Sequence, residues 1–282
     1  MPAPEFVAIG HVTLDRFGDK VRPGGSVAFA AVTAHRLGMT AGILTSHGDD
    51  FPLDAFPPQI EIVTVPAPAT TTFGHAVDSK GARSMTVGSA ARPLTPSDVP
   101  EDWLDAPLVL LAPVLDEVDP RLAATFSAGT VAAAAQGWLR RLGGDHRVVP
   151  RPWTSPEALL ARVQALFLSR EDIGGDEASA RAWFERVPVG ALTAGAAGAT
   201  LFVNGEEYAV RARRAREVDE TGAGDVFAAT FLVHYARDGD PWRAAAAASC
   251  AAALATEGEG WSAVPQRAAL ERALASYAED TD

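Results

Sequence analysis

Short apolar segments alternate with longer helical patterns along most of the chain, and this alternation limits the fold more than any other feature. Apolar runs of four or five residues are typical of strands buried on both faces. We expect strands at 6–9, 41–44, 108–112 and 191–193, helices at 26–37, 222–235 and 241–256, and a hairpin at 200–210. This order predicts an α/β fold with a mostly parallel central sheet and helices on both faces.

Residues 70–90 depart from this alternation. Two polar strand patterns flank a turn at Ser79–Ala82, which predicts a hairpin and not a strand–helix–strand unit. The pattern fits a lid over a cleft and an ordinary edge hairpin equally well. The proline-rich stretch 51–68 is expected to form a loop around a short strand.

Charge and cysteine content exclude several classes of function. The 282 residues carry a net charge of -12, which argues against non-specific binding to nucleic acid or membranes, because both are polyanionic. The lone cysteine, Cys250, allows no intrachain disulfide and is expected to be a small buried residue. The N-terminal segment lacks the features of a secretory signal, and no apolar stretch is long enough to span a bilayer. We therefore expect a cytoplasmic protein.

The segment 217–229 contains the pattern most informative about chemistry. Gly222, Ala223 and Gly224 lead directly into a predicted helix, where unpaired N–H groups and the helix dipole favour an anion. Asp225 follows in the first helical turn. A carboxylate beside a phosphate-binding turn can accept the proton of an attacking hydroxyl. The alternative is that Thr221 or Asp225 only caps the helix and the glycines only permit a turn.

The wider sequence resembles a known family in several places. Residues Asp219–Asp225 closely resemble the Asp-Thr-Gly-Ala-Gly-Asp signature of the ribokinase-like (PfkB) carbohydrate kinases. Further segments are similar to that family's motifs in the same order: 10–15 to its first strand and substrate-binding Asp, 23–30 to its Gly-Gly turn, 193–198 to its nucleotide-site turn, and 257–265 to its loop near the adenine. Together these matches cover nearly the whole chain.

The resemblance implies one kinase domain over residues 1–282, with a small β lid at about 70–90 and a contribution from about 12–22. It implies transfer of the ATP γ-phosphoryl group to a hydroxyl of a sugar or polyol, with Mg²⁺ accompanying ATP, and it allows a monovalent cation and a homodimer. The implied site comprises the base Asp225; the anion hole Gly222, Ala223 and Gly224; the substrate-binding residues Asp15, Gly24 and Gly25; and the nucleotide-binding residues Thr193, Gly195, Gly198, Ser249 and Gly258.

Three positions depart from the family pattern. Phe29 stands where a sugar-contacting Asn is common, so it either lines the substrate site or belongs to the core. The family's Asn-x-x-Glu motif appears as Ser169–Asp172, where Asp172 is either a metal ligand or a cap. Ser249–Cys250 replaces an Asn near the adenine.

Two further segments, 112–118 and 136–141, look like those of a subgroup that includes myo-inositol kinases. Gln136 is expected at a strand end facing the cleft as a substrate-binding residue. Arg140 is either a contact of a phosphate or substrate oxygen or a solvated loop arginine. His11 and His75 are further candidates to reach the substrate.

The leading hypothesis is an ATP-dependent sugar or polyol kinase, with myo-inositol or another cyclitol as the preferred acceptor. A nucleoside kinase of the same fold is a second hypothesis, with Phe17, Phe29 and Phe73 available to sandwich a base. A non-catalytic ligand sensor is a third, although a sensor has no need of Asp225.

Overall fold

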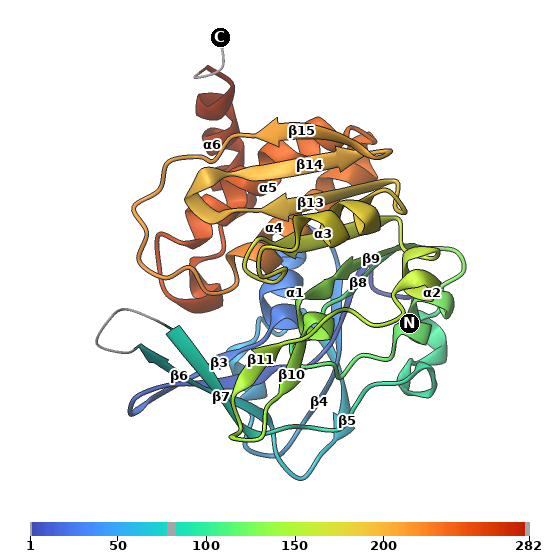
Figure 1. Ribbon diagram of the computed structural model, residues 1–282, viewed down its shortest axis with the longest axis vertical. Helices are drawn as coiled ribbons and strands as arrows, with labels where there is room; N and C mark the ends of the chain where they lie inside the picture. The colour runs from blue at the N-terminus through green and yellow to red at the C-terminus, as the bar shows by residue number, and fades with distance from the viewer. Residues whose placement is uncertain (1, 78–82, 280–282) are drawn as a thin grey trace.

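A nine-stranded sheet forms the centre of the protein in a computed structural model, which describes residues 2–77 and 83–279 (Figure 1). The strand order is β15-β14-β13-β12-β9-β8-β1-β4-β5. All neighbours from β13 to β5 are parallel, and β14 and β15 form an antiparallel edge. The strands are β1 Phe6–Ile9, β4 Ala41–His47, β5 Glu61–Pro66, β8 Leu108–Leu111, β9 Thr130–Ala134, β12 Ala165–Ser169, β13 Val189–Thr193, β14 Ala199–Val203 and β15 Glu206–Val210.

The central strands are buried on both faces, as their continuous apolar sequences predict. In β1, Phe6 and Ala8 contribute to one hydrophobic core, and Val7 and Ile9 contribute to the other. Side chains alternate between the faces of a strand, so one apolar run supplies both cores.

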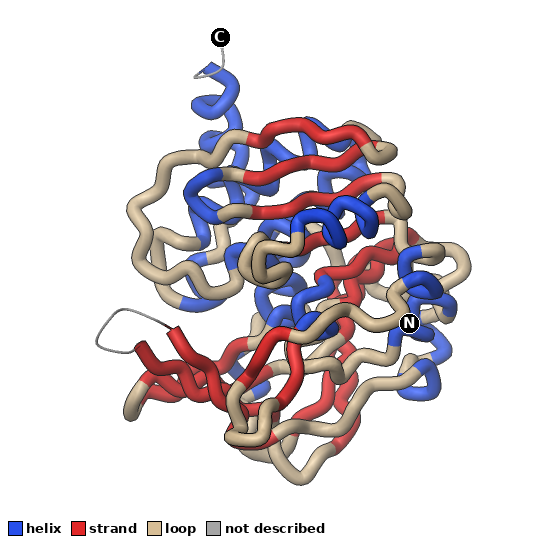
Figure 2. Tube along the Cα trace, in the orientation of Figure 1, coloured by secondary structure: helices blue, strands red, loops and turns tan. Residues whose placement is uncertain are grey.

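Helices cover both faces of this sheet (Figures 1 and 2). One core contains residues of α1 Ser26–Arg36, α4 Ala223–Asp238, α5 Pro241–Ala255 and α6 Arg267–Glu279. The other contains residues of α2 Glu157–Leu160 and α3 Glu177–Phe184. Short 3₁₀ helices complete the connections: η1 Leu53–Ala55, η2 Pro96–Asp98, η3 Glu101–Trp103, η4 Pro120–Ala124, η5 Ala135–Leu139, η6 Gly195–Ala197 and η7 Gly260–Ala263. The predicted α/β architecture is confirmed.

A separate four-stranded sheet, called the small sheet below, lies beside the central one (Figure 1). Its order is β3-β2-β6-β7, with β2 and β6 parallel and the outer pairs antiparallel. Its strands are β2 Thr13–Phe17, β3 Lys20–Gly24, β6 Thr71–Val77 and β7 Arg83–Ser89. The turn expected at Ser79–Ala82 lies outside the described residues. A two-stranded ribbon, β10 Arg140–Leu142 and β11 Val148–Pro150, approaches β7 through a bridge between Thr86 and Arg147.

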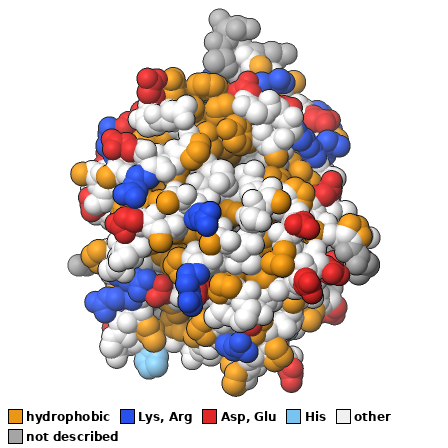
Figure 3. Space-filling view, turned by 90° about the vertical axis from the view of Figure 1, so that its right-hand side faces the viewer, with side chains coloured by type: hydrophobic (Ala, Val, Ile, Leu, Met, Phe, Trp, Pro, Cys, Tyr) orange, Lys and Arg blue, Asp and Glu red, His pale blue; other side chains and the backbone are white. Residues whose placement is uncertain are grey.

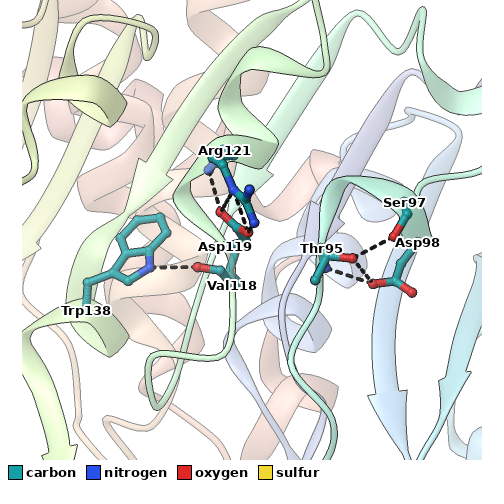
Figure 4. Close-up of polar contacts among 7 residues, drawn as sticks. All are labelled: Thr95, Ser97, Asp98, Val118, Asp119, Arg121 and Trp138. Atoms are coloured by element: carbon teal, nitrogen blue, oxygen red, sulfur yellow. Dashed lines mark hydrogen bonds and ion pairs between the residues drawn. The ribbon is translucent and has the colours of Figure 1, made fainter.

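Parallel strands place their carboxyl ends at one edge of the sheet, and the connections at this edge are tied together by buried polar groups. Glu117, in the loop after β8, is 5% exposed. Its carboxylate accepts hydrogen bonds from the N–H groups of His11, Val114 and Leu115 at 2.7–3.1 Å. The same carboxylate therefore holds the loop after β8 and the exit of β1. Nearby turns have their own caps, among them Thr95 with Asp98 and Arg121 with Asp119 (Figure 4).

Two surface properties follow from the described residues. No helix among them has the length and apolar character needed to cross a membrane. On the face shown in Figure 3, basic and acidic side chains are interspersed, without a large area of one sign.

Replacing Glu117 by Ala should lower the free energy of unfolding by about 3 kcal/mol, because the mutation leaves several buried N–H groups without an acceptor. Urea unfolding measures this loss. Glu157→Ala removes an exposed carboxylate at the start of α2 and should change stability by less than about 0.5 kcal/mol. Equal effects of the two substitutions would show that Glu117 is not a structural anchor.

Candidate active site

The start of α4 forms a turn that fits an anion. Gly222 has a left-handed backbone, with φ 78°, and precedes the first helical residue, Ala223. The Ala223 N–H donates to the Glu220 carbonyl at 3.1 Å, whereas no backbone carbonyl of the described residues accepts the N–H of Gly224 or Asp225. A Cβ atom on Gly224 would meet nothing within 4 Å. The free donors of the predicted anion hole thus lie at Gly224 and Asp225, beside open space.

Asp225 lies in the first turn of α4 and is half-buried. Burial raises the pKa of its carboxyl to about 7, and the negative charge of Asp172 acts in the same direction. A hydrogen bond from the Ser26 hydroxyl and the positive charge of Arg140 oppose the rise in pKa. A carboxyl with a pKa near neutrality is suited to accept a proton from an alcohol and to release it afterwards.

A small cleft of about 10 Å³, room for about one water molecule, opens between the small sheet and the segment before α4. Its lining residues are Asp15, Phe17, Arg22, Pro23, Gly24, Phe29, Asp219, Thr221 and Gly260. The cleft therefore brings together most of the residues predicted to bind substrate. A larger hollow of about 210 Å³ lies near His234 and Arg267, and it contains none of the predicted site residues.

Asp15 is the acidic group of the small sheet in this cleft. It is 7% exposed and accepts a hydrogen bond from the Thr13 hydroxyl at 3.2 Å. The His75 Nε2 atom lies 3.5 Å from the Asp15 carboxylate, and the His75 ring stacks on Phe17. A Cβ atom on Gly24 would lie 2.2 Å from Asp15 Oδ2, so glycine at this position makes room for the carboxylate. Gly25 precedes α1 and has a backbone φ of 101°, which favours glycine at this position.

Phe29 is both a core residue and a wall of the cleft. It is 3% exposed, and its ring packs so closely on Gly222 that a Cβ atom there would lie 2.3–2.4 Å from the ring carbons. Trp261 meets the same ring edge-on at 6.3 Å. The two alternatives expected for Phe29 are therefore not exclusive.

Arg22 links the small sheet to the segment before α4. Its guanidinium donates to Asp219 at 3.2 Å and lies 3.0 Å from Glu259. The other oxygen of Asp219 accepts the N–H of Thr221 at 3.0 Å. The Asp219 carboxylate thus holds the backbone just before the anion-binding turn and also binds Arg22 of strand β3.

The predicted nucleotide-binding residues come from β13, the turn after it, α5 and the loop after α5, and several have structural partners. The Ser249 hydroxyl donates to the Arg211 carbonyl at 2.8 Å, and the Thr193 hydroxyl donates to the Leu168 carbonyl at 3.3 Å. Gly198 has φ 92°, and a Cβ atom there would lie 2.2 Å from the Val210 carbonyl oxygen. Gly195 faces open space, whereas Gly258 packs against Ala263. Of these five residues, Gly195 has the most room for a ligand.

The expected metal ligand, Asp172, is already surrounded by donors. Its carboxylate accepts the Gln136 amide at 3.0 Å and the Ser169 N–H at 2.9 Å, and Arg140 lies 3.8 Å away. Among the described residues, no three acidic, histidine or cysteine side chains are grouped as a metal site. These residues do not fit a metal ion held by the protein. Gln136 lies in η5, one residue beyond the first position after β9, and its amide donates to Asp172. It was expected to face the cleft, but it is not among the residues that line it.

Other residues behave as packing or turn residues. His11 is 1% exposed, and its ring nitrogens meet the Arg92 carbonyl and the Thr71 hydroxyl, so it has a structural role. Cys250 is buried as expected, and burial raises the pKa of its thiol to about 11.

The sequence and fold of the chain are similar to those of known kinases. Residues 132–267 match the profile of the pfkB family carbohydrate kinases. This part of the chain, nearly half of its length, resembles a pfkB carbohydrate kinase domain. The chain is 29% identical to a fructokinase of Klebsiella pneumoniae over 291 residues, covering 89% of this chain and 92% of that one. It is 26% identical to a cytidine kinase of Thermococcus kodakarensis over 250 residues, covering 83% and 89%.

A solved structure of similar fold is a pyrophosphate-dependent kinase in the ribokinase family, complexed with a pyrophosphate analog and myo-inositol. It has a TM-score of 0.80 and 23% identity, with 95% of this chain and 99% of that chain covered. The chain is a phosphotransferase with a hydroxyl acceptor, and its acceptor class is a sugar or a nucleoside.

Two site residues were not identified from the sequence. The Ser26 hydroxyl lowers the pKa of Asp225 by hydrogen bonding, and Arg22 pairs with Asp219. Phe17, a candidate from the sequence, stacks on His75 beside Asp15. Ser26 follows the Gly24–Gly25 turn immediately, and that position was the available signal for it. Arg22 has no local signal, because its partners lie about 200 residues later in the chain.

The raised pKa of Asp225 predicts a pH-dependent effect of Asp225→Asn on stability. In the unfolded protein this carboxyl has a pKa near 3.8, so the folded protein binds the proton more tightly. The protonated carboxyl therefore contributes stability that is fully present below pH 4 and is lost as the pH rises through 7. The substitution removes the buried charge. It should raise the free energy of unfolding at pH 8 by up to about 4 kcal/mol and much less at pH 5.

The same substitution should reduce turnover by at least about 10²-fold, as expected for loss of a general base. In the wild type, kcat/KM should fall as the pH drops below 7. Thermal unfolding at both pH values and initial rates across pH 5.5–9 measure these effects. An equal stability change at pH 5 and pH 8, or turnover near the wild-type value, would contradict the assignment.

Gly222 and Gly224 should respond differently to substitution. Gly224→Val places its side chain in open space, so the fold should persist while phosphate approach is blocked and activity is lost. Gly222→Ala forces a Cβ atom into the Phe29 ring at a left-handed φ and should lower the melting temperature by several degrees. Thermal melts and activity assays separate the two outcomes. An active Gly224→Val variant would leave the turn with a structural role only.

Proposed function

We propose that this chain transfers the γ-phosphoryl group of ATP to a hydroxyl of a polyol, with myo-inositol or another cyclitol as the acceptor. The observation that carries this proposal is the cleft of Asp15, Phe17 and Phe29, in which Phe29 packs on Gly222 at the start of the anion-binding turn. A cyclitol has hydroxyls at its rim and C–H groups on its faces. The Asp15 carboxylate can accept hydrogen bonds from the rim hydroxyls, and the phenyl rings can pack against the C–H faces.

In the proposed reaction, the acceptor lies in the cleft with one hydroxyl toward Asp225. The oxygen attacks the terminal phosphorus in line, the bond to the leaving phosphate oxygen breaks, and Asp225 takes the hydroxyl proton. The N–H groups at the start of α4 bind the oxygens of the transferring group. Mg²⁺ would enter with the phosphates of ATP, because Asp172 does not provide a protein-built site for it.

Two observations support a small hydroxyl-bearing acceptor, but they do not distinguish a cyclitol from a sugar or a nucleoside. The similar solved structure is described with bound myo-inositol, and the relatives of known activity are a fructokinase and a cytidine kinase. A nucleoside acceptor is the second candidate, because Phe17 and Phe29 both line the cleft. Phe73 is 4% exposed and packs with Val87 and Val114, so it does not complete an aromatic sandwich. Cytoplasmic location and a homodimer remain predictions.

An assay with a panel of acceptors tests the proposal. Purified protein receives myo-inositol, ribose, fructose or cytidine with either ATP or pyrophosphate, and ³¹P NMR identifies the phosphorylated product. We expect the cyclitol to exceed ribose and fructose in kcat/KM by tenfold or more, about 1.4 kcal/mol, and ATP to exceed pyrophosphate. Fructose, ribose or cytidine as the best acceptor would reject the cyclitol, and faster pyrophosphate turnover would reject ATP.

Two variants assign the cleft residues in the same assay. Asp15→Asn should raise the KM for the acceptor, lower kcat, or both, and leave the KM for ATP unchanged. Phe29→Asn should narrow the preference for the cyclitol over ribose. A variant of Asp15 impaired chiefly in its use of ATP would place that residue on the donor side.

A further inference from the structure

Arg140 occupies a fixed position at the edge of the sheet where the reaction is proposed to occur. It follows η5, whose Gly137 N–H donates to the Pro113 carbonyl at 3.0 Å. A Cβ atom on Gly137 would lie 2.4 Å from the Pro113 carbonyl carbon, so glycine permits this close approach. The Trp138 indole N–H donates to the Val118 carbonyl at 2.9 Å (Figure 4). These contacts fix the backbone from which the Arg140 side chain extends.

Acidic groups from three different connections surround this arginine. The charges of Asp172, Asp225, Glu171 and Glu117 favour its protonated form, while burial lowers the pKa of the guanidinium. Glu117 comes from the loop after β8, Glu171 and Asp172 from the turn after β12, and Asp225 from the start of α4. Arg140 is therefore a cation at the junction of these elements and not a solvated loop residue. Its side chain is 23% exposed.

The guanidinium N–H groups of Arg140 make few contacts with acceptors among the described residues. A guanidinium carries five N–H donors, yet its side-chain contact among the described residues is the 3.8 Å approach of Nη2 to Asp172. The same Asp172 oxygen accepts a shorter hydrogen bond from Gln136 at 3.0 Å. A largely buried cation with unfilled donors is costly unless a ligand supplies oxygen acceptors.

We propose that the Arg140 guanidinium binds the non-bridging oxygens of the transferring phosphoryl group and is a catalytic residue. The inference rests on the proposed phosphoryl transfer. As the acceptor oxygen bonds to phosphorus, the bond to the leaving oxygen breaks, and the electron pair departs with the donor product. The acceptor proton moves to Asp225. Arg140 stays protonated throughout and offsets charge that the carboxylates nearby would otherwise repel.

The chemistry of the site favours this role over a purely structural one. Phosphoryl transfer needs positive charge at the equatorial oxygens, and the residues around Asp172 do not form a protein-held metal site. A planar, doubly donating cation matches two phosphate oxygens, whereas a structural arginine would have its donors filled by carbonyls or carboxylates.

Arg140→Met and Arg140→Lys test the proposal against a matched control, Arg141→Met. Arg141 is the next residue on β10 and is exposed. With the best donor and acceptor from the panel, Arg140→Met should lower kcat by at least about 10²-fold and change the acceptor KM by less than about threefold. Arg140→Lys should retain an intermediate kcat, and Arg141→Met should match the wild type.

Chemical rescue distinguishes a catalytic guanidinium from a structural one. Guanidinium chloride at low millimolar concentration should restore part of the kcat of Arg140→Met and leave wild type and Arg141→Met unchanged. A kcat of Arg140→Met within threefold of the wild type, or a loss with no rescue while circular dichroism shows a native fold, would overturn the proposal. If Arg140→Met does not fold, Arg140→Lys decides: a wild-type kcat in that variant overturns it. A wild type inactive with every donor and acceptor would instead reject the proposed function.

Discussion

The packing of the Phe29 ring on Gly222 joins the two halves of the proposed site. Phe29 belongs to α1 and walls the acceptor cleft, while Gly222 begins the anion-binding turn. Because the ring lies directly against the glycine α-carbon, the cleft cannot move away from the turn without opening the core. In the proposed reaction, this contact would set how near an acceptor hydroxyl comes to a phosphate at the start of α4. Arg22 and Asp219 add a second connection from the small sheet.

The proposed site also depends on a balance between its acidic side chains and the positive charge of Arg140. Asp225 and Asp172 repel one another electrostatically, and burial raises the pKa of Asp225 to about 7. Arg140 lies among these acids and reduces the repulsion. A donor phosphate brings further negative charge to the same place. The free N–H groups of the turn and the Arg140 guanidinium are the positive elements that the described residues provide for it.

Local sequence patterns predicted much of the fold and the turn on which the proposed site is centred. Apolar runs identified β1, β4, β8 and β13, and the glycine-rich segment identified the start of α4. Patterns within a few residues could not reveal contacts between distant segments. Glu117 binds the N–H of His11 across 106 positions, and Phe29 meets Gly222 although the two are far apart in the sequence. Likewise, nothing local indicates that Ser249 is engaged by the Arg211 carbonyl, or that Asp172 faces Gln136.

A crystal structure with ADP, aluminium fluoride and the best acceptor tests the central claim most directly. We expect a planar aluminium fluoride between the N–H groups of Gly224 and Asp225 and the acceptor cleft, with the acceptor oxygen in line and within hydrogen-bond distance of the Asp225 carboxylate. A fluoride bound away from the start of α4, or an acceptor oxygen that does not reach Asp225, would contradict it.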